Sequence, residues 1–547
     1  MTDITLPQGG MQAGGCLLTK LTNFDIAHVK PLYDINTCTR LEAVSLHIEA
    51  PDCAYDLIVD ISQSISAQIL NAIPTCRILN AGSYNSIDTY IIHMATSSED
   101  RGLFCRNFGL NRLRNGDWIF VAGDTILGNC GDYVITVHPA ISSLHLVSNE
   151  TEAERSAIIR IVRELERNPF TILPTFSFTL LSSMRSKISA LGLTTFPALY
   201  VVGQQGFGKT MLVSRYALLY DKILGGMSAK PYGNLDANST SKGVIGEISK
   251  YQDQVILIDD LAKGSTASVQ RERQKLMAEV LHFATNGSIR QTASNLSDNG
   301  SCVCQCGVAF TGEIPLSAAS DLTRLIEVQL TAPMNGGVAT DRTAAATAFR
   351  AWMIWLLPHL DAELLTLSRQ LSSITGNEEG RLETSKMLLL WSAELFYRFA
   401  LETDIVDQVY FRSVICEASK IFETLLASQA KKVSRIQCAP PRGNLAWYVL
   451  RGYHNGDFHV VSRKKLKSDE DCVVEKDALC IRTETLLSYL RSKANLGCLS
   501  SKGMTKGLCK EGVLENHSEM RNAGKRIHGK RYLELSFVAL HRAAKCY

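Results

Sequence analysis

Eight consecutive residues near the middle of the chain have the types and spacing that bind the phosphates of a nucleotide. They match the pattern G-x-x-x-x-G-K-[ST] and consist of Gly203, Gln204, Gln205, Gly206, Phe207, Gly208, Lys209 and Thr210. The glycines let the backbone curl so that successive N–H groups point at phosphate oxygens. The lysine would reach the β- and γ-phosphates, and the threonine would hold Mg²⁺. A chance glycine-rich turn is the alternative.

The residues on either side of this loop supply the context that the pattern needs. The apolar run Ala198–Val202 predicts a buried strand that leads into the loop, and Met211–Tyr220 predicts a helix after it. A helix that begins here adds the positive end of its dipole to the phosphate site. Strand, glycine loop and helix together favour nucleotide binding over a chance turn.

A second stretch, Gln254–Asp260, places two aspartates directly after four apolar residues. A strand this apolar is typical of the middle of a parallel sheet. Asp259 is then placed to hold the Mg²⁺ shell beside Thr210, and Asp260 to polarise the attacking water. The alternative is a buried strand whose two acids cap the next element. Asp259 follows Lys209 by 50 residues, which leaves room for the intervening helices and strand of a nucleotide-binding domain.

Three further residues are candidates to complete the catalytic site. Gly307–Thr311 predicts another buried strand. In ring-forming ATPases such a strand lies beside the two-acid strand, and its last polar residue, here Thr311, senses the γ-phosphate. Arg324 precedes a last predicted strand and would reach the nucleotide of a neighbouring subunit, with a surface salt bridge as the alternative. Arg381 stands at a predicted helix start, where a small lid would face the nucleotide; an ordinary exposed arginine fits equally well.

The rest of the first 430 residues supplies elements around these candidates. Glu152–Arg167 predicts an amphipathic helix, Phe170–Leu193 a second and more apolar helix, and Asp341–Gln429 a helical region. Short strands, among them Tyr90–Met94, alternate with helices before residue 150, without a catalytic pattern. We interpret residues 1–150 as an α/β accessory domain, 151–340 as the nucleotide-binding core with its preceding helices, and 341–430 as a helical lid region.

The composition argues against several other classes of protein. None of the 16 cysteines forms a Cys-x-x-Cys pair, so neither a zinc site nor a disulfide framework is indicated. Cys302, Cys304 and Cys306 alternate at strand period and are expected to fill one face of a strand. No apolar run reaches the ~18 residues of a membrane span, and the N-terminus has no signal-peptide pattern. We expect a reducing, cytoplasmic setting.

The positive charge is concentrated at the end of the chain. Residues 431–547 contain 23 Lys and Arg against 11 Asp and Glu, a net charge of +12 in a chain whose total is +3. This excess favours a polyanionic partner over a solvated basic tail. Thr483–Ala494 and Thr505–Leu514 predict two short helices, and Tyr532–Val538 predicts a strand after a basic loop.

Helix, helix, basic loop and strand form the pattern of a winged helix. The second helix would present lysines to DNA and the wing would present basic residues to phosphates. A winged helix that binds another protein is the alternative. The candidate DNA contacts are Lys502, Lys506, Lys510, Lys525, Arg526, Lys530 and Arg531.

The chain resembles a group of ATPases, the helicase- and primase-associated proteins of phages and chromosomal mobile elements. The resemblance lies in NPF…GLTTFPALYVVGQQGFGKT, NSTSKGVIGEISKYQDQVILIDDL, ATNGSIRQ and VAFTGEIPL…LTRLIEV. It extends upstream through LNAGSYNSIDTYIIHM and NGDWIFVAGDTILG and downstream to the basic end, with specific motifs in residues 196–330. The group is similar to ring helicases of the AAA+ type, such as superfamily-three viral helicases and minichromosome-maintenance proteins.

The resemblance implies an α/β fold. It consists of an AAA+-like ATPase core, an N-terminal α/β accessory domain, a helical lid and a C-terminal winged helix. It also implies an ATP- and Mg²⁺-dependent helicase that forms a homo-hexamer, binds ATP between subunits and replicates a phage or mobile element. The predicted β-hairpin 287–306 would grip single-stranded DNA in the pore, with Arg290 near its base. Relatives usually carry Asp-Glu where this chain has Asp259-Asp260, although superfamily-three proteins also use two aspartates. A nucleotide-switched DNA-binding protein that does not unwind DNA is the second hypothesis.

Overall fold

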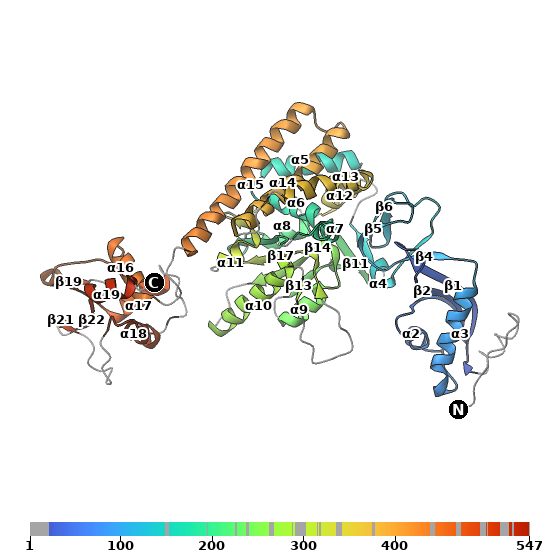
Figure 1. Cartoon of the computed structure of the whole chain (residues 1–547), viewed down its shortest axis with the longest axis horizontal. Helices are drawn as coiled ribbons and strands as arrows, with labels where there is room; N and C mark the ends of the chain where they lie inside the picture. Colours follow the sequence, from blue (N-terminus) through green and yellow to red (C-terminus); the bar gives the residue numbers. More distant parts are fainter. Residues whose placement is uncertain are drawn as a thin grey trace. The chain divides into compact units, whose positions relative to one another are not determined.

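Figure 1 shows the chain in a computed structural model. It describes residues 21–147, 153–193, 195–224, 227–236, 240–261, 267–286, 288–289, 302–313, 316, 319–334, 342–372, 374, 378–437, 444–466, 472–492, 499, 501–514, 525–527 and 530–545. The chain divides into two compact units, Met1–Lys431 and Lys432–Tyr547. The finer division of the first unit into three domains stays a prediction. In the described part, no helix combines the length and the apolar character that a membrane span requires.

A five-stranded sheet with the order β13–β14–β17–β10–β18 forms the centre of the first unit. Every neighbouring pair of its strands is parallel. The strands are β10 Ala198–Gly203, β13 Asn234–Asp236, β14 Gln252–Leu261, β17 Gln305–Gly312 and β18 Leu325–Leu330. The two-acid strand β14 therefore lies beside β17, as the sequence analysis predicts. β17 separates β14 from the strand that leads into the phosphate loop.

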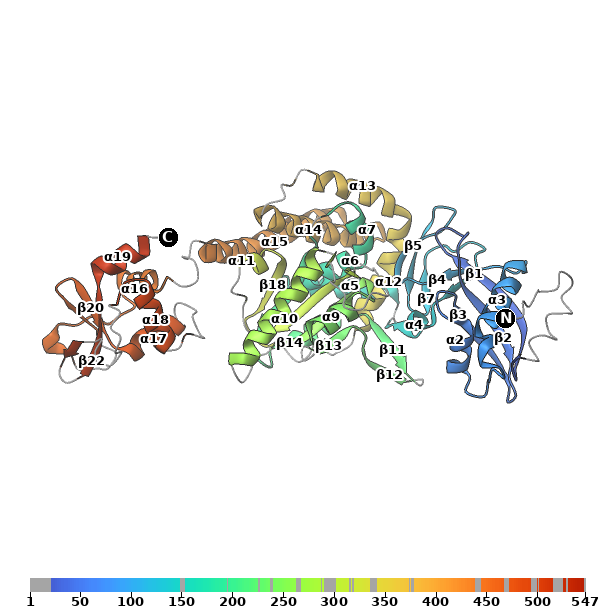
Figure 2. The ribbon, with the colours of Figure 1, turned by 60° about the horizontal axis from the view of Figure 1, so that its bottom comes forward.

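Side chains of these strands alternate between two cores, one on each face of the sheet. On one face, Val201 and Val255 pack with the helices α6, α8, α12 and α14. On the other face, Tyr200 and Ile256 pack with α9 and α10. Figure 2 shows α9 and α10 in front of the sheet. The helices next to the sheet in sequence are α8 Lys209–Tyr216, α9 Ser241–Ile248, α10 Ala267–Asn286 and α11 Ala319–Leu322.

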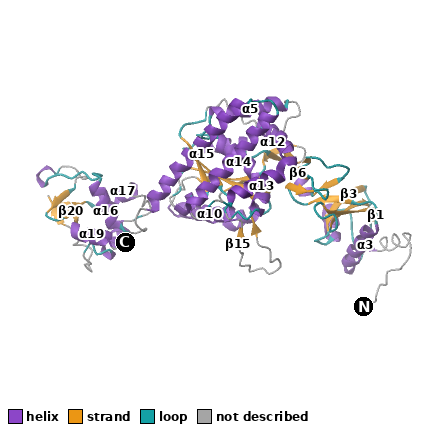
Figure 3. Ribbon diagram, turned by 45° about the horizontal axis from the view of Figure 1, so that its top comes forward, coloured by secondary structure: helices purple, strands orange, loops and turns teal. Residues whose placement is uncertain are grey.

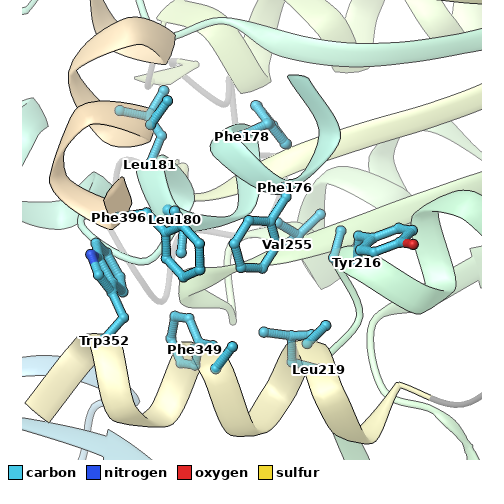
Figure 4. Packing of buried hydrophobic residues seen from close by; sticks show 14 of the residues in the cluster. Phe176, Phe178, Leu180, Leu181, Tyr216, Leu219, Val255, Phe349, Trp352 and Phe396 are labelled. Atoms are coloured by element: carbon cyan, nitrogen blue, oxygen red, sulfur yellow. The ribbon is translucent and has the colours of Figure 1, made fainter. Parts of the chain in front are cut away.

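A layer of helices covers the first of these faces (Figure 3). It comprises α5 Glu154–Arg167, α6 Ile172–Ser182, α7 Arg185–Ala190, α12 Thr343–Leu356, the 3-10 turn Leu357–His359, α13 Leu360–Leu371, α14 Glu378–Glu402 and α15 Gln408–Gln437. Figure 4 shows Phe349 and Trp352 of α12 facing Phe176 and Leu180 of α6. Burial of each aromatic side chain contributes about 1.5–3 kcal/mol to the stability of the folded state.

The single helix predicted over Phe170–Leu193 is wrong, because the chain breaks between α6 and α7 at Ser183 and Met184. Arg185, at the start of α7, turns into the core. Its Nη1 donates to the Cys306 carbonyl at 2.7 Å, and its guanidinium lies 4.4 Å from the ring centroid of Phe196. A helix that continued through Ser183 and Met184 would not place the Arg185 guanidinium against the start of β17.

The N-terminal part of the first unit contains a second sheet, with the order β3–β2–β1–β4–β8. Its strands and helices are β1 Asp25–Asp34, β2 Leu41–Glu49, β3 Ala54–Asp60, α2 Ile65–Ala72, the 3-10 turn Ala81–Ser83, α3 Tyr84–Ser97, β4 Gly102–Cys105, β8 Ile135–Val137 and α4 Pro139–Ser142. The strand predicted over Tyr90–Met94 is wrong, because these residues belong to α3. Ile87, Ile91 and Ala95 recur at helical spacing and are buried, so the apolar face of a helix prevails over the short run of β-formers.

Smaller antiparallel strands join this part to the central sheet. They are β5 Gly109–Arg112, β6 Trp118–Ala122, β7 Thr125–Leu127, β9 Leu144–Leu146, β11 Tyr220–Leu224 and β12 Met227–Pro231. The fully buried carboxylate of Asp253, on β14, accepts hydrogen bonds from the Leu110 amide at 3.0 Å and from the Ser186 amide and hydroxyl, each at 2.7 Å. Gly109 packs so closely here that an added Cβ would lie 2.4 Å from the Asp253 Cβ.

The second unit combines four helices with a four-stranded antiparallel sheet of order β19–β20–β22–β21. Its elements are α16 Leu445–His454, the 3-10 turn Arg463–Lys465, β19 Val473–Glu475, β20 Ala478–Ile481, α17 Thr483–Ser492, α18 Ser501–Lys510, β21 Lys525–Ile527, β22 Lys530–Ser536 and α19 Phe537–Lys545. The second predicted helix thus begins four residues earlier than expected, at Ser501. The predicted last strand ends at Ser536, and Val538 lies in α19.

Candidate functional site

The predicted phosphate loop connects β10 to α8, as the sequence analysis expects. Gly203 is the last residue of β10, and Lys209 is the first residue of α8. Gly206 and Gly208 adopt φ angles of 78° and 87°, which side chains disfavour and glycine accepts. The helix ends at Tyr216, four residues earlier than predicted, because Tyr220 begins β11.

Three residues meet beside this loop, Thr210 at the start of α8, Asp259 near the end of β14 and Thr311 near the end of β17. The Thr210 hydroxyl donates to Asp259 Oδ1 at 2.8 Å. The Thr311 hydroxyl, near the end of β17, donates to the same oxygen at 2.5 Å. Because all strands of the sheet are parallel, their carboxyl ends lie at one edge, where open α/β sheets bind ligands. The structure therefore brings together the candidates that the sequence analysis drew from separate stretches.

The ammonium group of Lys209 lies within the loop itself. Lys209 Nζ donates to the carbonyls of Gly203 at 3.0 Å and Gln204 at 2.9 Å. The Phe207 carbonyl accepts a hydrogen bond from the Met334 amide at 3.1 Å, which ties the loop to the segment after β18. A cation and a helix N-terminus thus lie at the same point, an arrangement suited to a polyphosphate.

The oxygen atoms near the loop fit Mg²⁺ better than a softer metal. Thr210 and Asp259 supply a hydroxyl and a carboxylate oxygen within hydrogen-bond distance of one another. Mg²⁺ in nucleotide sites usually takes one or two carboxylates and shares the remaining positions with phosphates and water. The described residues contain no group of three or more His, Cys, Asp or Glu able to hold an ion. An ion held by the Thr210 hydroxyl and the Asp259 carboxylate would complete its coordination with nucleotide phosphates and water.

Arg324, one of the two predicted arginines, lies far from the loop of its own chain. The Arg324 carbonyl accepts from the amide of Ala198, the first residue of β10, so Arg324 lies at the amino edge of the sheet. The length of β10 separates it from the phosphate loop by about 17 Å. Burial and the Arg324 charge lower the pKa of His282; Asp321 opposes this and Arg381 reinforces it. The charges of both arginines thus act on this imidazole.

His282, on α10, is a residue that was not predicted from the sequence. Its Nε2 lies 3.9 Å from Asp321 Oδ1. No motif marks it, because its neighbours come from α11 and α14.

The sequence analysis also missed the anchor of the phosphate-loop helix, Glu164 on α5. Its carboxylate accepts hydrogen bonds from Arg215, from the Tyr216 hydroxyl at 2.7 Å and from Arg160 Nε at 3.3 Å. Burial, followed by the bond to Glu164, raises the pKa of Tyr216. The amphipathic pattern of α5 predicts a helix but gives no reason to expect a partner on α8.

Other candidates lie partly outside the described residues. Ser288–Ile289 pairs antiparallel with Cys302–Val303, so the base of the predicted hairpin is confirmed, whereas Arg290 lies outside the described residues. Asp260 belongs to β14, but its side chain lies outside them.

The basic candidates of the second unit also fall partly outside the described residues. Those on α18 are exposed, and those on β21 and β22 have side chains outside the described residues; the two groups are Lys502, Lys506 and Lys510, and Lys525, Arg526, Lys530 and Arg531.

Comparison with solved structures places the whole chain in a known fold. An active helicase, Cch of SCCmec type IV, matches over 96% of this chain and 95% of its own, with a TM-score of 0.53 and 13% identity. At this identity the likeness is one of fold. JCV helicase, in complex with a small molecule, matches over 50% of this chain and 74% of its own, with 13% identity and a TM-score of 0.20. No protein-family model matches the chain, and no curated protein matches it.

Proposed function

We propose that this chain is an ATP-dependent, ring-forming DNA helicase that acts in the replication of a phage or mobile genetic element. The observation that carries the proposal is the meeting of Thr210, Asp259 and Thr311 beside Lys209. The likeness in fold to an active helicase over nearly the whole chain supports it. The link to phages and mobile elements rests on the resemblance in sequence.

In this proposal the residues of the phosphate loop bind and orient ATP. The backbone N–H groups of the loop hold the phosphates, Lys209 neutralises the charge of the β- and γ-phosphates, and Thr210 and Asp259 hold Mg²⁺. When bound, Mg²⁺ neutralises charge that develops on the phosphate oxygens. Asp260 orients the attacking water, and Thr311 detects the state of the γ-phosphate through its bond to Asp259.

Arg324 and Arg381 complete the site of a neighbouring subunit. Neither residue belongs to the edge of the sheet that carries the loop of its own chain, so each would act on a nucleotide bound by the next copy. An arginine supplied in trans stabilises the charge of phosphoryl transfer. A ring of identical heterologous contacts gives every nucleotide such a partner, and we propose a homo-hexamer.

The DNA contacts are assigned to two regions. The hairpin between β15 and β16, with Arg290, would follow the strand in the pore. In the second unit, the order of α16, β20, α17, α18 and the β21–β22 hairpin supports a winged helix. There α18 would present Lys502, Lys506 and Lys510 to DNA, and the wing Lys525, Arg526, Lys530 and Arg531.

Hydrolysis of ATP by a Lys209→Ala variant tests the proposal. We expect turnover to fall by about 10²–10³-fold, because a preorganised charge on the transferred phosphate is lost. The matched control is Lys250→Ala, which removes an exposed lysine paired with Glu247 at 2.6 Å on the surface. Turnover retained in Lys209→Ala would refute the assignment.

The same measurement, repeated with single-stranded DNA, separates the two hypotheses of the sequence analysis. Stimulation by DNA supports the helicase. ATP-dependent assembly on DNA with negligible turnover would instead identify a nucleotide-switched DNA-binding protein.

A further inference from the structure

The second unit carries a basic surface that the winged-helix assignment does not use. It lies on α16 and α19, the first and last helices of the unit, and we call it the α16–α19 face. Its residues are Trp447, Arg451, His454, Val538, His541 and Arg542.

The two helices that form this face pack directly against each other. The Asn444 side chain, at the N-terminus of α16, donates to the Ala543 carbonyl near the end of α19 at 3.0 Å. At the other end of α16, the ring centroids of Tyr453 and Phe537 are 4.8 Å apart. The face is therefore a continuous surface on a fixed pair of helices.

Planar and cationic groups alternate on this face. The Arg451 guanidinium lies 5.1 Å from the ring centroid of Trp447, one helical turn away. The rings of His454 and His541 lie 6.2 Å apart and join the two helices. Val538 is 60% exposed. Stacking platforms beside cations are the groups that bind single-stranded nucleic acid without regard to sequence.

The helices of this face carry no carboxylate of their own. Neither α16 nor α19 contains an Asp or Glu. Within the described part of this unit, the ion pairs join Arg463 to Glu475 and Arg482 to Glu484, so neither Arg451 nor Arg542 takes part in them. The Glu511 carboxylate, beside the start of α16, accepts hydrogen bonds from the Leu445 and Ala446 amides at 2.7 and 2.8 Å. Asp457, which follows α16, accepts a hydrogen bond from the Tyr489 hydroxyl at 3.4 Å. An exposed basic surface on two helices without Asp or Glu complements a phosphate backbone.

This face is separate from the lysines of α18. Met504 and Leu508 of α18 are buried in the core of the unit, and the lysines of α18 are exposed on the opposite side of the helix. In both Figure 1 and Figure 2, α16 and α19 lie in the upper part of the unit and α18 lies below them. We propose that the α16–α19 face binds single-stranded DNA, as a second DNA contact in addition to α18 and the wing. This inference goes beyond the proposed function and does not depend on ATP hydrolysis.

Anisotropy titration of the full chain, without nucleotide, with a labelled oligothymidylate tests the inference. The variant is Arg451→Gln with Arg542→Gln, and the control is Lys464→Gln with Lys476→Gln, which removes two exposed charges of the same unit that belong to neither α16 nor α19. We expect the variant to bind about tenfold more weakly. The plot of log K against log salt should become less steep by about 1.4, since each lost phosphate contact on a single strand contributes about 0.7. The control should stay close to the wild type.

Trp447 provides a second readout that does not require a charge variant to fold. It is the one tryptophan of residues 432–547 in the sequence, so single-stranded DNA should quench fluorescence that Trp447→Phe removes. Unchanged affinity in the arginine variant, an equal loss in the control, or quenching as large in Trp447→Phe as in the wild type would overturn the inference. A loss seen only with duplex DNA would also overturn it. None of these outcomes bears on turnover, so a failed helicase assignment would be recognised separately.

Discussion

Asp259 is the residue at which the chemistry of the first unit converges. It accepts hydrogen bonds from Thr210 and Thr311, which fixes a carboxylate between the phosphate-loop helix and the strand that separates β14 from β10. A change at the γ-phosphate would alter what these two hydroxyls contact, and Asp259 would transmit it to β14. The amino end of β14 carries a second aspartate, Asp253, whose side chain is fully buried.

That second aspartate, Asp253, predicts a pH dependence of stability. Burial raises the pKa of Asp253 from 3.8 to about 6, against the opposing hydrogen bonds from Ser186 and Leu110. The folded state therefore holds this proton more tightly than the unfolded state. The stabilisation is fully present below about pH 4 and is lost as the pH rises to about 6, a change of up to about 3 kcal/mol.

Thermal midpoints of the wild type and Asp253→Asn between pH 4 and pH 7 measure this term. Asn cannot ionise, so the midpoint of the wild type relative to the variant should fall across this window and level off above it. A difference that is constant from pH 4 to pH 7 would show that Asp253 does not titrate there.

At the scale of elements, α8 is held at both ends. Its first residues form the phosphate site, and its last turn is held by Glu164 of α5 through Arg215 and Tyr216. The α5 helix is in turn bound to the segment between α14 and α15, because Arg155 donates to the Thr403 and Asp404 carbonyls at 3.2 and 2.8 Å. The nucleotide loop is thus anchored to the helical layer.

Removal of the Glu164 carboxylate is predicted to destabilise the first unit. The side chain of Arg215 is only 4% exposed, and Glu164→Ala would leave this charge buried without its carboxylate, at a cost of about 3–5 kcal/mol. The thermal midpoint should drop, and ATP turnover should fall with it. Glu383→Ala, which removes an exposed carboxylate 3.9 Å from Lys386, should change neither. A stable Glu164→Ala protein would show that α8 does not depend on this anchor.

The elements that the sequence predicts well are those whose characteristic residues follow one another within a short stretch of the chain. The phosphate loop, β10 and β14 are short motifs with strong local patterns, and the base of the hairpin follows from its flanking strands. The prediction of a strand over Tyr90–Met94 was wrong, because a five-residue apolar run is compatible with a strand and with one face of a helix. The break before Arg185 depends on partners in β17, which the local sequence does not contain.

Parts of the candidate site escaped prediction for the same reason. Glu164 has a partner, Tyr216, that lies 52 residues away along the chain, and His282 has a partner, Asp321, that lies 39 residues away. The charges of Arg324 and Arg381 act on the imidazole of His282 on α10, although the three residues lie far apart in the sequence. Sequence patterns identify such residues singly, and the tertiary structure brings them together.

At the scale of the whole molecule, the proposal requires contacts between copies of the chain. The phosphate loop lies at the carboxyl edge of the central sheet and Arg324 at the amino edge, so in this proposal the Arg324 of one chain would complete the site of another. Heterologous contacts that close into a ring would pair these two edges.

Mixing two inactive variants tests this pairing. Lys209→Ala removes the nucleotide contact but keeps Arg324, and Arg324→Ala does the reverse. An equal mixture should recover about a quarter of the wild-type ATP turnover, because in a randomly mixed ring of heterologous contacts one site in four receives both residues. Mixtures that stay inactive would show that Arg324 does not act across the interface.

Displacement of the shorter strand from a tailed DNA duplex, with ATP and Mg²⁺, is the measurement that tests the central claim most directly. We expect displacement by the wild type. We expect none by Asp259→Asn, which keeps oxygen and nitrogen atoms near Thr210 and Thr311 but removes the charge that would hold Mg²⁺. Binding of a fluorescent ATP analogue should persist in the variant, as a control for folding. DNA-stimulated hydrolysis by the wild type without any strand displacement would contradict the claim that this chain is a helicase.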